Sequence, residues 1–582
     1  MEDRYVRANQ FLASRSCAPA PPRPNTTVLF KIFDDSRPSL LNSPSPFDAF
    51  AWQSLLVDYP GDLPAILTKT LQYGALIGYE GPETLILSDN QESVHRAPGV
   101  IASGLQSDLT LGRIVPTSTS SPYICSPLGL VPKGDGGWRR IHNLSHPPKR
   151  SVNAHIDPEC TSLEYTTIED ILRMVKVAGR HCIILKRDIK DAFRNVPIAP
   201  HSQWPLGFKW EEQFYKETCL PFGLATAPFI FNLFAEGFHW ILQSWLNWDL
   251  LQHYLDDFIL VIPVAAQHTI PTINAEYIEI TNILGIPRND SKDRVGTVLT
   301  VLGLEIDTNL FTLRVPEEKL LQAYKATAKA LDQDSITLNE IQSTAGFLGF
   351  CAPAVQLGRL HMRTIWTFVA SFPQHKSHFV RKRILAAVRE DLLWWRDLLP
   401  RWNGVLFFDE SARSNISIFT DASGLGLGGF FTLGTVNTES VDYSTIPITN
   451  AFATPIATQQ KDKLDINVHE MDAIHYAFVT WGHSWSKMRV TIYTDNMTCY
   501  RGLQKQTLNS NAFMPLRQTL LIAAGFDIVL VPMWIPGYSN TLADALSRFD
   551  FGRIANICPH WQDFSSLNPH HHSTNGKGQS ST

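Results

Sequence analysis

Two adjacent aspartates constrain the fold of this chain more than any other feature. Asp256 and Asp257 lie between two apolar, β-prone runs, 248–251 and 258–264, and this pattern predicts a hairpin with both carboxylates at its tip. Neighbouring carboxylates repel each other, so such a pair requires a cation or a solvated turn to offset the repulsion. By itself the hairpin leaves open the ordinary alternative, an exposed Asp-Asp turn.

A second apolar run also ends on an acid. Residues 182–188 read Cys-Ile-Ile-Leu-Lys-Arg-Asp, which predicts a strand that ends at Asp188. If this strand pairs beside the hairpin, Asp188 meets Asp256 and Asp257 at one edge of a sheet. Three carboxylates there can hold two Mg²⁺ ions through oxygen ligands. Two ions about 4 Å apart activate an attacking 3′-hydroxyl and stabilise a leaving pyrophosphate, so the pattern indicates phosphoryl transfer.

The motifs around these acids occur in the order of a known family. Asp-x-x-x-Ala-Phe begins at residue 188, Leu-Pro-Phe-Gly-Leu at 220 and Tyr-Leu-Asp-Asp at 254. Upstream, residues 132–140 begin with Pro-Lys and end with Trp-Arg-Arg; downstream stand Lys292 and a Val-Leu-Gly at 301–303. In these six ordered matches the chain resembles reverse transcriptases. The resemblance implies an α+β right-hand polymerase with fingers, a ferredoxin-like palm and a helical thumb or connection.

The resemblance also implies roles for individual residues. Asp188, Asp256 and Asp257 become metal ligands, assisted by the backbone carbonyl of Ile189. Five further residues become substrate-binding: Lys133, Arg139, Phe193, Gly223 and Lys292.

Ordinary chemistry supports these substrate-binding roles and also offers plainer ones. Lys133 and Arg139 pair with phosphates of the incoming nucleotide, the arginine in a bidentate manner. The ring of Phe193 leaves no space for a 2′-hydroxyl, so deoxynucleotides are preferred, and Gly223 lets the backbone approach the nucleotide closely. Without the motifs, Phe193 reads as a core residue. Lys133 and Arg139 then read as parts of a solvated, glycine-rich turn.

A second set of acids occurs in the last third of the chain. The alternating runs 416–421 and 490–495 each predict a strand that ends on an aspartate, Asp421 and Asp495. Glu470 opens a predicted helix between them, and Asp544 lies in the first turn of a later helix. In this order the four acids resemble the ribonuclease H site, which binds two Mg²⁺ ions and hydrolyses RNA paired with DNA.

Two observations weaken this second resemblance. Asn467-x-x-Glu470 is a capping-box pattern, so Glu470 is alternatively a residue that only satisfies backbone donors. Many members of the family carry a histidine in the loop before the last acid, but residues 534–540 contain none. That histidine is not a metal ligand, so its absence puts in doubt the turnover rate rather than the reaction.

Further strings resemble one group of retroelements. His-Asn-Leu-Ser at 142–145, Ala-Gly at 345–346 and Trp-Trp at 394–395 are similar to DIRS/Ngaro retrotransposons, although pararetroviral polymerases share some of them. That group integrates with a tyrosine recombinase of about 150 residues or more, and only 33 residues follow Phe549. We therefore expect a separately encoded recombinase or integrase.

Length and pattern predict the domain organisation. The 582 residues correspond to three to five domains at roughly 100 to 200 residues each. The segments expected are a 1–110 N-terminal extension (1–45 loosely ordered, then short helices), 111–310 fingers and palm, 311–410 helical thumb/connection, a 411–549 α/β ribonuclease H-like domain and a 550–582 flexible tail.

Composition restricts the partners and the compartment. The net charge of −5 counts against nucleic acid, but basic residues cluster, as in 133–150 with five Lys/Arg against one acid. We see neither an apolar signal segment nor a run of the ~18 apolar residues that a membrane span needs, and the eight cysteines stand singly. We expect an intracellular protein of the cytoplasm or nucleus, neither secreted nor membrane-bound.

Three functions compete at this point. The leading one is an RNA-directed DNA polymerase with ribonuclease H. It uses two Mg²⁺ per site (Mn²⁺ is possible), an RNA template, a DNA primer, deoxynucleoside triphosphates and an RNA–DNA hybrid. The second is a catalytically inactive or co-opted copy that binds nucleic acid; its signature would be lost acids, and all seven are present. The third, a DNA-templated repair polymerase, is disfavoured by the linked ribonuclease H motifs.

Overall fold

The structure is a computed structural model that describes residues 44–567. Within this range, the structure does not describe residues 121, 133–135, 374–379, 408–412, 439–440, 457–464 and 509. Lys133 therefore lies outside the described residues. So do residues 1–43, which were predicted to be loosely ordered, and residues 568–582, which were predicted to be flexible. The chain divides into two compact units, Met1–Phe311 and Thr312–Thr582.

The central sheet of the first unit is formed by the strands that carry the first acids. Its order is β11-β6-β10-β9, with β6 at Ile183–Asp188, β9 at Leu251–Tyr254, β10 at Asp257–Ile262 and β11 at Arg294–Gly296. Strand β10 pairs antiparallel with both β6 and β9, so β9 and β10 form the predicted hairpin. Residues 258–262 are all buried, because this continuous apolar run is covered on both faces.

Helices surround this sheet and continue into the N-terminal segment. They are α3 (Ala49–Leu55), α4 (Leu63–Tyr73), α6 (Ile168–Ala178), α7 (Ala227–Leu246) and α8 (Ile270–Leu284). Trp52 of α3 is fully buried; its indole Nε1 donates to the carbonyl of Leu284, and its ring meets Phe234 edge-on at 5.5 Å. The short helices expected after residue 45 are thus part of the palm core rather than an appended segment.

A smaller layered region carries the segment around Arg139. It contains a five-stranded sheet with order β1-β3-β7-β8-β2, the hairpin β4–β5 and helix α5. The bounds are β1 Leu85–Leu87, β2 Ile114–Thr117, β3 Tyr123–Cys125, β4 Leu128–Pro132, β5 Trp138–His142, β7 Gly207–Trp210, β8 Gln213–Glu217 and α5 Pro98–Thr110. Ile101, Leu105 and Phe208 belong to its separate small core. A further hairpin, β12 (Val298–Val301) and β13 (Leu304–Asp307), follows β11.

The second unit begins with a short strand and continues with helices, in the region where the sequence predicts a mainly helical pattern. They are α9 (Glu317–Leu331), α10 (Leu338–Cys351), α11 (Arg363–Ala370) and α12 (Ala386–Trp402). Two short strand pairs accompany them: β14 (Thr312–Arg314) with β17 (Val405–Leu406), and β15 (Ser335–Thr337) with β16 (Arg381–Arg383). Helix α10 begins at Leu338 because the preceding residue, Thr337, is its N-cap and forms a capping box with Glu340.

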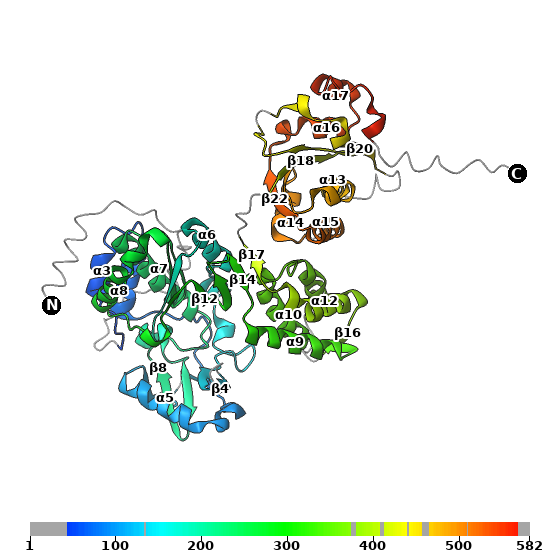
Figure 1. Cartoon of the computed structure of the whole chain (residues 1–582). Coiled ribbons are helices and arrows are strands. Elements are labelled where there is room, and N and C mark those ends of the chain that lie inside the picture. Colours follow the sequence, from blue (N-terminus) through cyan, green and yellow to red (C-terminus); the bar gives the residue numbers. More distant parts are fainter. Residues whose placement is uncertain are drawn as a thin grey trace. The chain divides into compact units, whose positions relative to one another are not determined.

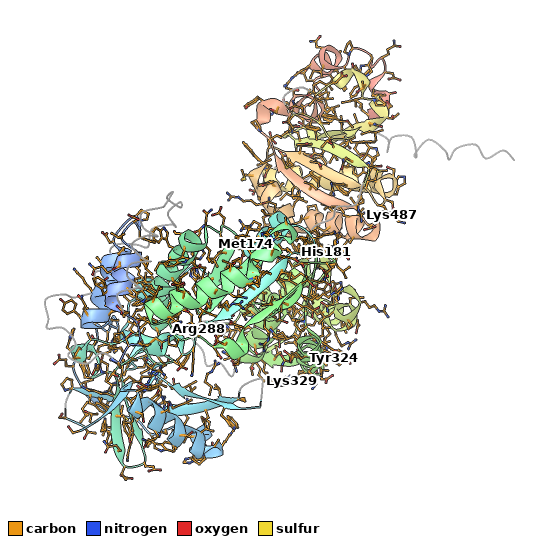
Figure 2. All side chains as sticks on the ribbon, turned by 60° about the vertical axis from the view of Figure 1, so that its left-hand side comes forward. Met174, His181, Arg288, Tyr324, Lys329 and Lys487 are labelled. Atoms are coloured by element: carbon orange, nitrogen blue, oxygen red, sulfur yellow. The ribbon has the colours of Figure 1, made fainter. Side chains whose placement is uncertain are left out.

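A five-stranded sheet covered on both faces completes the second unit (Figure 1). The strands are β18 (Asn415–Ala422), β19 (Gly426–Leu433), β20 (Ala451–Pro455), β21 (Arg489–Thr494) and β22 (Val529–Trp534), in the order β20-β19-β18-β21-β22. Ile416 and Ile418 face the helices α13 (Ile466–Trp481), α14 (Met497–Lys505) and α15 (Phe513–Gly525). Phe419 faces the other way, toward α16 (Thr541–Ser547) and α17 (Phe551–Ile557). The predicted α/β class is confirmed.

The flexible tail predicted from residue 550 is wrong for residues 551–567. Helix α17 and a 3₁₀ turn at Phe564–Leu567 pack into the core with Ile554, Trp561 and Leu567 buried. The Trp561 indole donates to the Ile446 carbonyl at 2.8 Å. Apolar residues three apart in α17 were the signal in the sequence. No helix in the described part of the chain is long and apolar enough to cross a membrane.

Candidate active sites

The strand register places the first acids at one edge of the palm sheet. Asp257 opens β10 directly opposite Asp188, the last residue of β6. Leu255 adopts a positive φ of 53° in the hairpin turn that precedes Asp256. The amide of Ile189 donates to the Asp256 carbonyl at 3.0 Å, which fixes this turn against the end of β6. The structure therefore places the three acids at one sheet edge, as the sequence predicted, but their carboxylate oxygens do not all lie within 4.8 Å of one another.

Amines partly neutralise this concentration of negative charge. Lys292 Nζ lies 3.2 and 3.3 Å from the two Asp188 carboxylate oxygens, and Lys186 Nζ lies 2.9 Å from Asp257 Oδ2. Burial, and then the neighbouring Asp257, raises the pKa of Asp256 to about 6. Carboxylates whose charged forms are disfavoured in this way gain from an added cation. The residues present thus fit an oxygen-coordinated divalent ion, and Lys292, predicted to contact substrate, contacts Asp188.

A cavity of about 740 Å³ opens beside these acids. Its lining includes six residues singled out from the sequence: Arg139, Asp188, Ile189, Phe193, Asp256 and Lys292. Phe193 is half-buried, with its ring 5.3 Å from that of Phe222 and 5.6 Å from that of the fully buried Phe231. Phe193 therefore lies at the boundary between core and cavity, where both interpretations of this residue retain support.

Gly223 has a structural reason to be glycine. Its φ is +113°, and an added Cβ would lie 2.0 Å from the carbonyl oxygen of His142. The His142 amide of β5 donates to the Phe222 carbonyl at 3.2 Å, and Asn153 Nδ2 donates to the Gly223 carbonyl at 2.9 Å, so the loop is held against β5 and Asn153. This close approach is to protein backbone; approach to a nucleotide stays a prediction.

The cavity wall contains a buried ion network that sequence patterns do not indicate. Arg194 pairs with Glu217 at 2.7 Å and with Asp108 at 3.2 Å, and Asp108 also pairs with Arg140 at 2.5 Å. Burial opposes the charge on Glu217, but Arg194 and further cations outweigh it and lower its pKa to about 2. The members come from α5, β5, β8 and the segment after Phe193, so only the tertiary fold brings them together.

The second set of acids meets at one edge of the other sheet. Strands β18 and β21 run parallel, so Asp421 near the end of β18 and Asp495 just after β21 lie at the same edge. Glu470 of α13 joins them, and each of the three offers an oxygen within 4.8 Å of the others. Among the described residues, no other three histidine, cysteine or acidic side chains meet this distance.

The capping-box interpretation of Glu470 is wrong. Helix α13 is capped by Asp465, whose side chain accepts from the Asn467 amide, so Glu470 lies beyond the first turn. Its Oε2 is buried without a hydrogen-bond partner. Burial, followed by Asp421 and Asp495, raises the pKa of Glu470 to about 9. An orphaned oxygen among three crowded carboxylates fits a divalent cation with oxygen ligands.

Asp544, the fourth predicted acid, does not join this group. Its carboxylate accepts from Arg548 Nε at 2.6 Å and from the Arg553 guanidinium at 2.5 Å. The sequence placed Asp544 correctly in the first turn of a helix but gave no sign of the two arginines that hold it. The structure therefore unites three of the four predicted nuclease acids.

The raised pKa of Glu470 predicts a pH-dependent stability. Between the ordinary value of 4.5 and about 9, the folded chain keeps a proton that the unfolded chain releases, so stability from this group is lost as pH rises. In a chelator, Glu470→Gln should therefore be the more stable protein, by a margin that widens across this window. Thermal unfolding of both proteins from pH 4.5 to 9 measures it; a constant margin would contradict the assignment.

Part of this chain is similar to known proteins. Residues 131–305 match the family model "Reverse transcriptase (RNA-dependent DNA polymerase)". The Gag-Pro-Pol polyprotein of Mason-Pfizer monkey virus is 23% identical over 296 residues, 49% of this chain and 15% of that protein. Protein P of Heron hepatitis B virus is 27% identical over 183 residues, 31% of this chain and 22% of that protein. This chain thus covers only a small part of these relatives.

A solved structure of foamy viral protease-reverse transcriptase with double-stranded DNA is also similar. Its TM-score is 0.45 at 16% identity, covering 89% of this chain and 84% of that one.

The matched residues, 131–305, span β5, β6, β9 and β10 and contain the palm acids and most of the cavity-lining residues. This chain therefore contains a reverse transcriptase domain. The domain is of the kind found in retroviral and retroelement polyproteins.

Proposed function

We propose that this chain is an RNA-directed DNA polymerase that also has ribonuclease H activity. The observation that carries the proposal is the register of β6 and β10, which sets Asp188 opposite Asp257 beside the 740 Å³ cavity within the matched domain. A second, separate acid group in the other unit supports the nuclease activity. Extension of a DNA primer on an RNA template by the purified chain tests the polymerase.

The residues of the palm bind and orient the substrates. Asp188, Asp256 and Asp257 would hold Mg²⁺ at the sheet edge. When bound, such ions supply Lewis-acid activation of the primer 3′-hydroxyl and neutralise charge on the leaving pyrophosphate. Arg139 lies on the cavity wall, its guanidinium 5.8 Å from the Phe222 ring centroid, where it can pair with a triphosphate. Lys133 would act beside it, and Ile189 would offer its carbonyl.

The residues of the second site act on the RNA of the hybrid. Asp421, Glu470 and Asp495 form the deep part of a Mg²⁺ site, and Asp544 would complete it from α16. Ser547 Oγ donates to Asp421 Oδ2 at 2.5 Å in the buried interior and so fixes the orientation of that carboxylate. The site thus offers oxygen ligands of fixed position, which cleavage of a phosphodiester requires.

Phe193 is proposed as the gate that selects deoxynucleotides. Phe193→Val opens space at the cavity wall and should raise ribonucleotide incorporation relative to deoxynucleotides by roughly 10- to 200-fold. Steady-state incorporation of each ribonucleotide and of the deoxynucleotide with the same base measures this ratio. Phe231→Leu is the matched control, because Phe231 touches the Phe193 ring but is fully buried and does not line the cavity. An active Phe193→Val protein with unchanged discrimination would disprove the gate.

The retroelement group to which the enzyme belongs and its cellular compartment are also proposals. The strings at 142–145, 345–346 and 394–395 support a DIRS/Ngaro-type retrotransposon, which would supply a recombinase from another reading frame. The seven cysteines among the described residues are all buried and none of them is in a disulfide, which supports a reducing, intracellular compartment. The second candidate function, an inactive nucleic-acid-binding copy, is favoured by one observation, the separation of Asp544 from the other nuclease acids.

A further inference from the structure

Two arginines from consecutive helices converge on one carboxylate beside the nuclease site. Arg548 follows α16, and Arg553 lies within α17; both bind Asp544, one at each oxygen. Phe549, with φ of +55°, forms the turn between the helices, and Asp550 caps α17 by accepting from the Arg553 amide. The local backbone therefore fixes this convergence.

The charges in this cluster do not balance. Two guanidiniums form ion pairs with a single carboxylate, although the charge of Asp421 also acts on Arg548. The side chains of Arg548 and Arg553 are 58% and 40% exposed, whereas that of Asp544 is 24% exposed. Solvent-exposed ion pairs contribute little to stability, so another anion can replace the carboxylate at small cost. A phosphate fits best, since it accepts bidentate hydrogen bonds from guanidinium groups.

The helical turn that carries Asp544 is linked directly to the other acids. Ser547 Oγ donates to Asp421 Oδ2 at 2.5 Å and to the backbone carbonyl of Asp544 at 3.0 Å. The arginines thus lie on the solvent side of Asp544, where a nucleic-acid backbone can approach. The metal site formed by the other three acids would need the Asp544 carboxylate as its fourth ligand.

We propose that Arg548 and Arg553 form a phosphate-binding site for the backbone of the RNA–DNA hybrid, a site that Asp544 fills until the hybrid arrives. Phosphate binding releases Asp544 toward Asp421 and Asp495, so the full set of acids assembles only on substrate. This inference rests on the proposed nuclease function and adds an order of events to it.

The test uses the full chain with Arg548→Gln and Arg553→Gln together. Hybrid binding in a chelator is measured across a salt series, which involves no cleavage. Each lost phosphate contact should reduce the slope of log affinity against log salt by about 0.7 to 0.9, or roughly 1.4 to 1.8 for both. An unchanged slope would overturn the proposal.

A second measurement separates this role from a structural one. Mn²⁺ binding without nucleic acid is measured in an Asp256→Asn, Asp257→Asn background, so that the nuclease site reports alone. Removing both arginines frees Asp544 and should tighten Mn²⁺ binding by about two- to fivefold, the range typical of an exposed ion pair. Damage to the fold would weaken both hybrid and Mn²⁺ binding, and that result would overturn the proposal.

Two further variants complete the design. Asp544→Asn should tighten hybrid binding in chelator, because the guanidiniums lose their competitor; weaker binding would contradict the placeholder role. Arg413→Gln is the matched control, since Arg413 pairs with Asp527 before the start of β18, at the opposite end from Asp421. Absence of hybrid cleavage by the parental chain would overturn the nuclease function, a result distinct from these binding measurements.

Discussion

DNA synthesis is expected to fall by more than about 100-fold when Asp256 and Asp257 are both replaced by asparagine, since loss of even outer-shell partners of a metal costs 10- to 100-fold. Asparagine keeps the size of the side chain but removes the charge that a divalent ion requires. Cleavage of hybrid RNA should persist at the parental rate, because the nuclease acids belong to the other compact unit. Primer extension and hybrid cleavage are measured on the same preparations.

Asp249→Asn is the control for this pair. Asp249 is an exposed aspartate just before β9 of the same hairpin, and it does not line the 740 Å³ cavity. Its replacement should leave synthesis within about twofold, as expected for a surface substitution. If the Asp256→Asn, Asp257→Asn double variant synthesised DNA at a rate near that of Asp249→Asn, the hairpin acids would not be the catalytic ones.

Glu470→Gln is expected to produce the opposite separation, with hybrid cleavage lost by more than about 100-fold and synthesis unchanged. Glutamine has the same shape and stays neutral at every pH, so it fits the buried position of Glu470 but cannot bind a cation as a carboxylate does. Because burial and two neighbouring acids raise the pKa of Glu470 to about 9, cation binding by the parental chain must also compete with a proton. Parental cleavage at limiting Mg²⁺ should therefore increase with pH toward 9.

Asp472→Asn is the matched variant for Glu470. Asp472 lies two residues further along α13 and its pKa is also raised by burial, but it is not one of the three clustered acids. Its replacement should retain cleavage. If Glu470→Gln cleaved hybrids as fast as Asp472→Asn, the three-acid group would have no role in cleavage.

The positions of the acids at strand ends could be predicted because the signals are local. An apolar run that ends on Asp188, or on Asp421, fixes both the strand and the side chain at its tip. The register of β10 with β6 does not follow in the same way, because the run 258–262 is apolar throughout and buried on both faces, so a shift by one residue would expose no polar side chain. Glu470 was ambiguous because a capping box depends on where the helix begins, and the observed cap, Asp465, lies two residues before Asn467.

Features that depend on contacts across the fold could not be predicted. Arg194, Glu217 and Asp108 lie in three distant segments, and only packing places them in one buried network. The two arginines on Asp544 are brought together by the turn between α16 and α17, and Arg553 lies in the segment from residue 550 that composition assigned to a flexible tail. The pairing of Lys292 with Asp188 likewise joins residues 104 positions apart.

The most direct test of the account is one reaction with two labels. A DNA primer labelled at its 5′ end is annealed to a differently labelled RNA template, and the purified full chain is added with Mg²⁺ and deoxynucleoside triphosphates. The account predicts that the primer lengthens to the end of the template and that the copied RNA is shortened in the same tube. A folded chain that binds the hybrid but neither extends the primer nor shortens the RNA would contradict it.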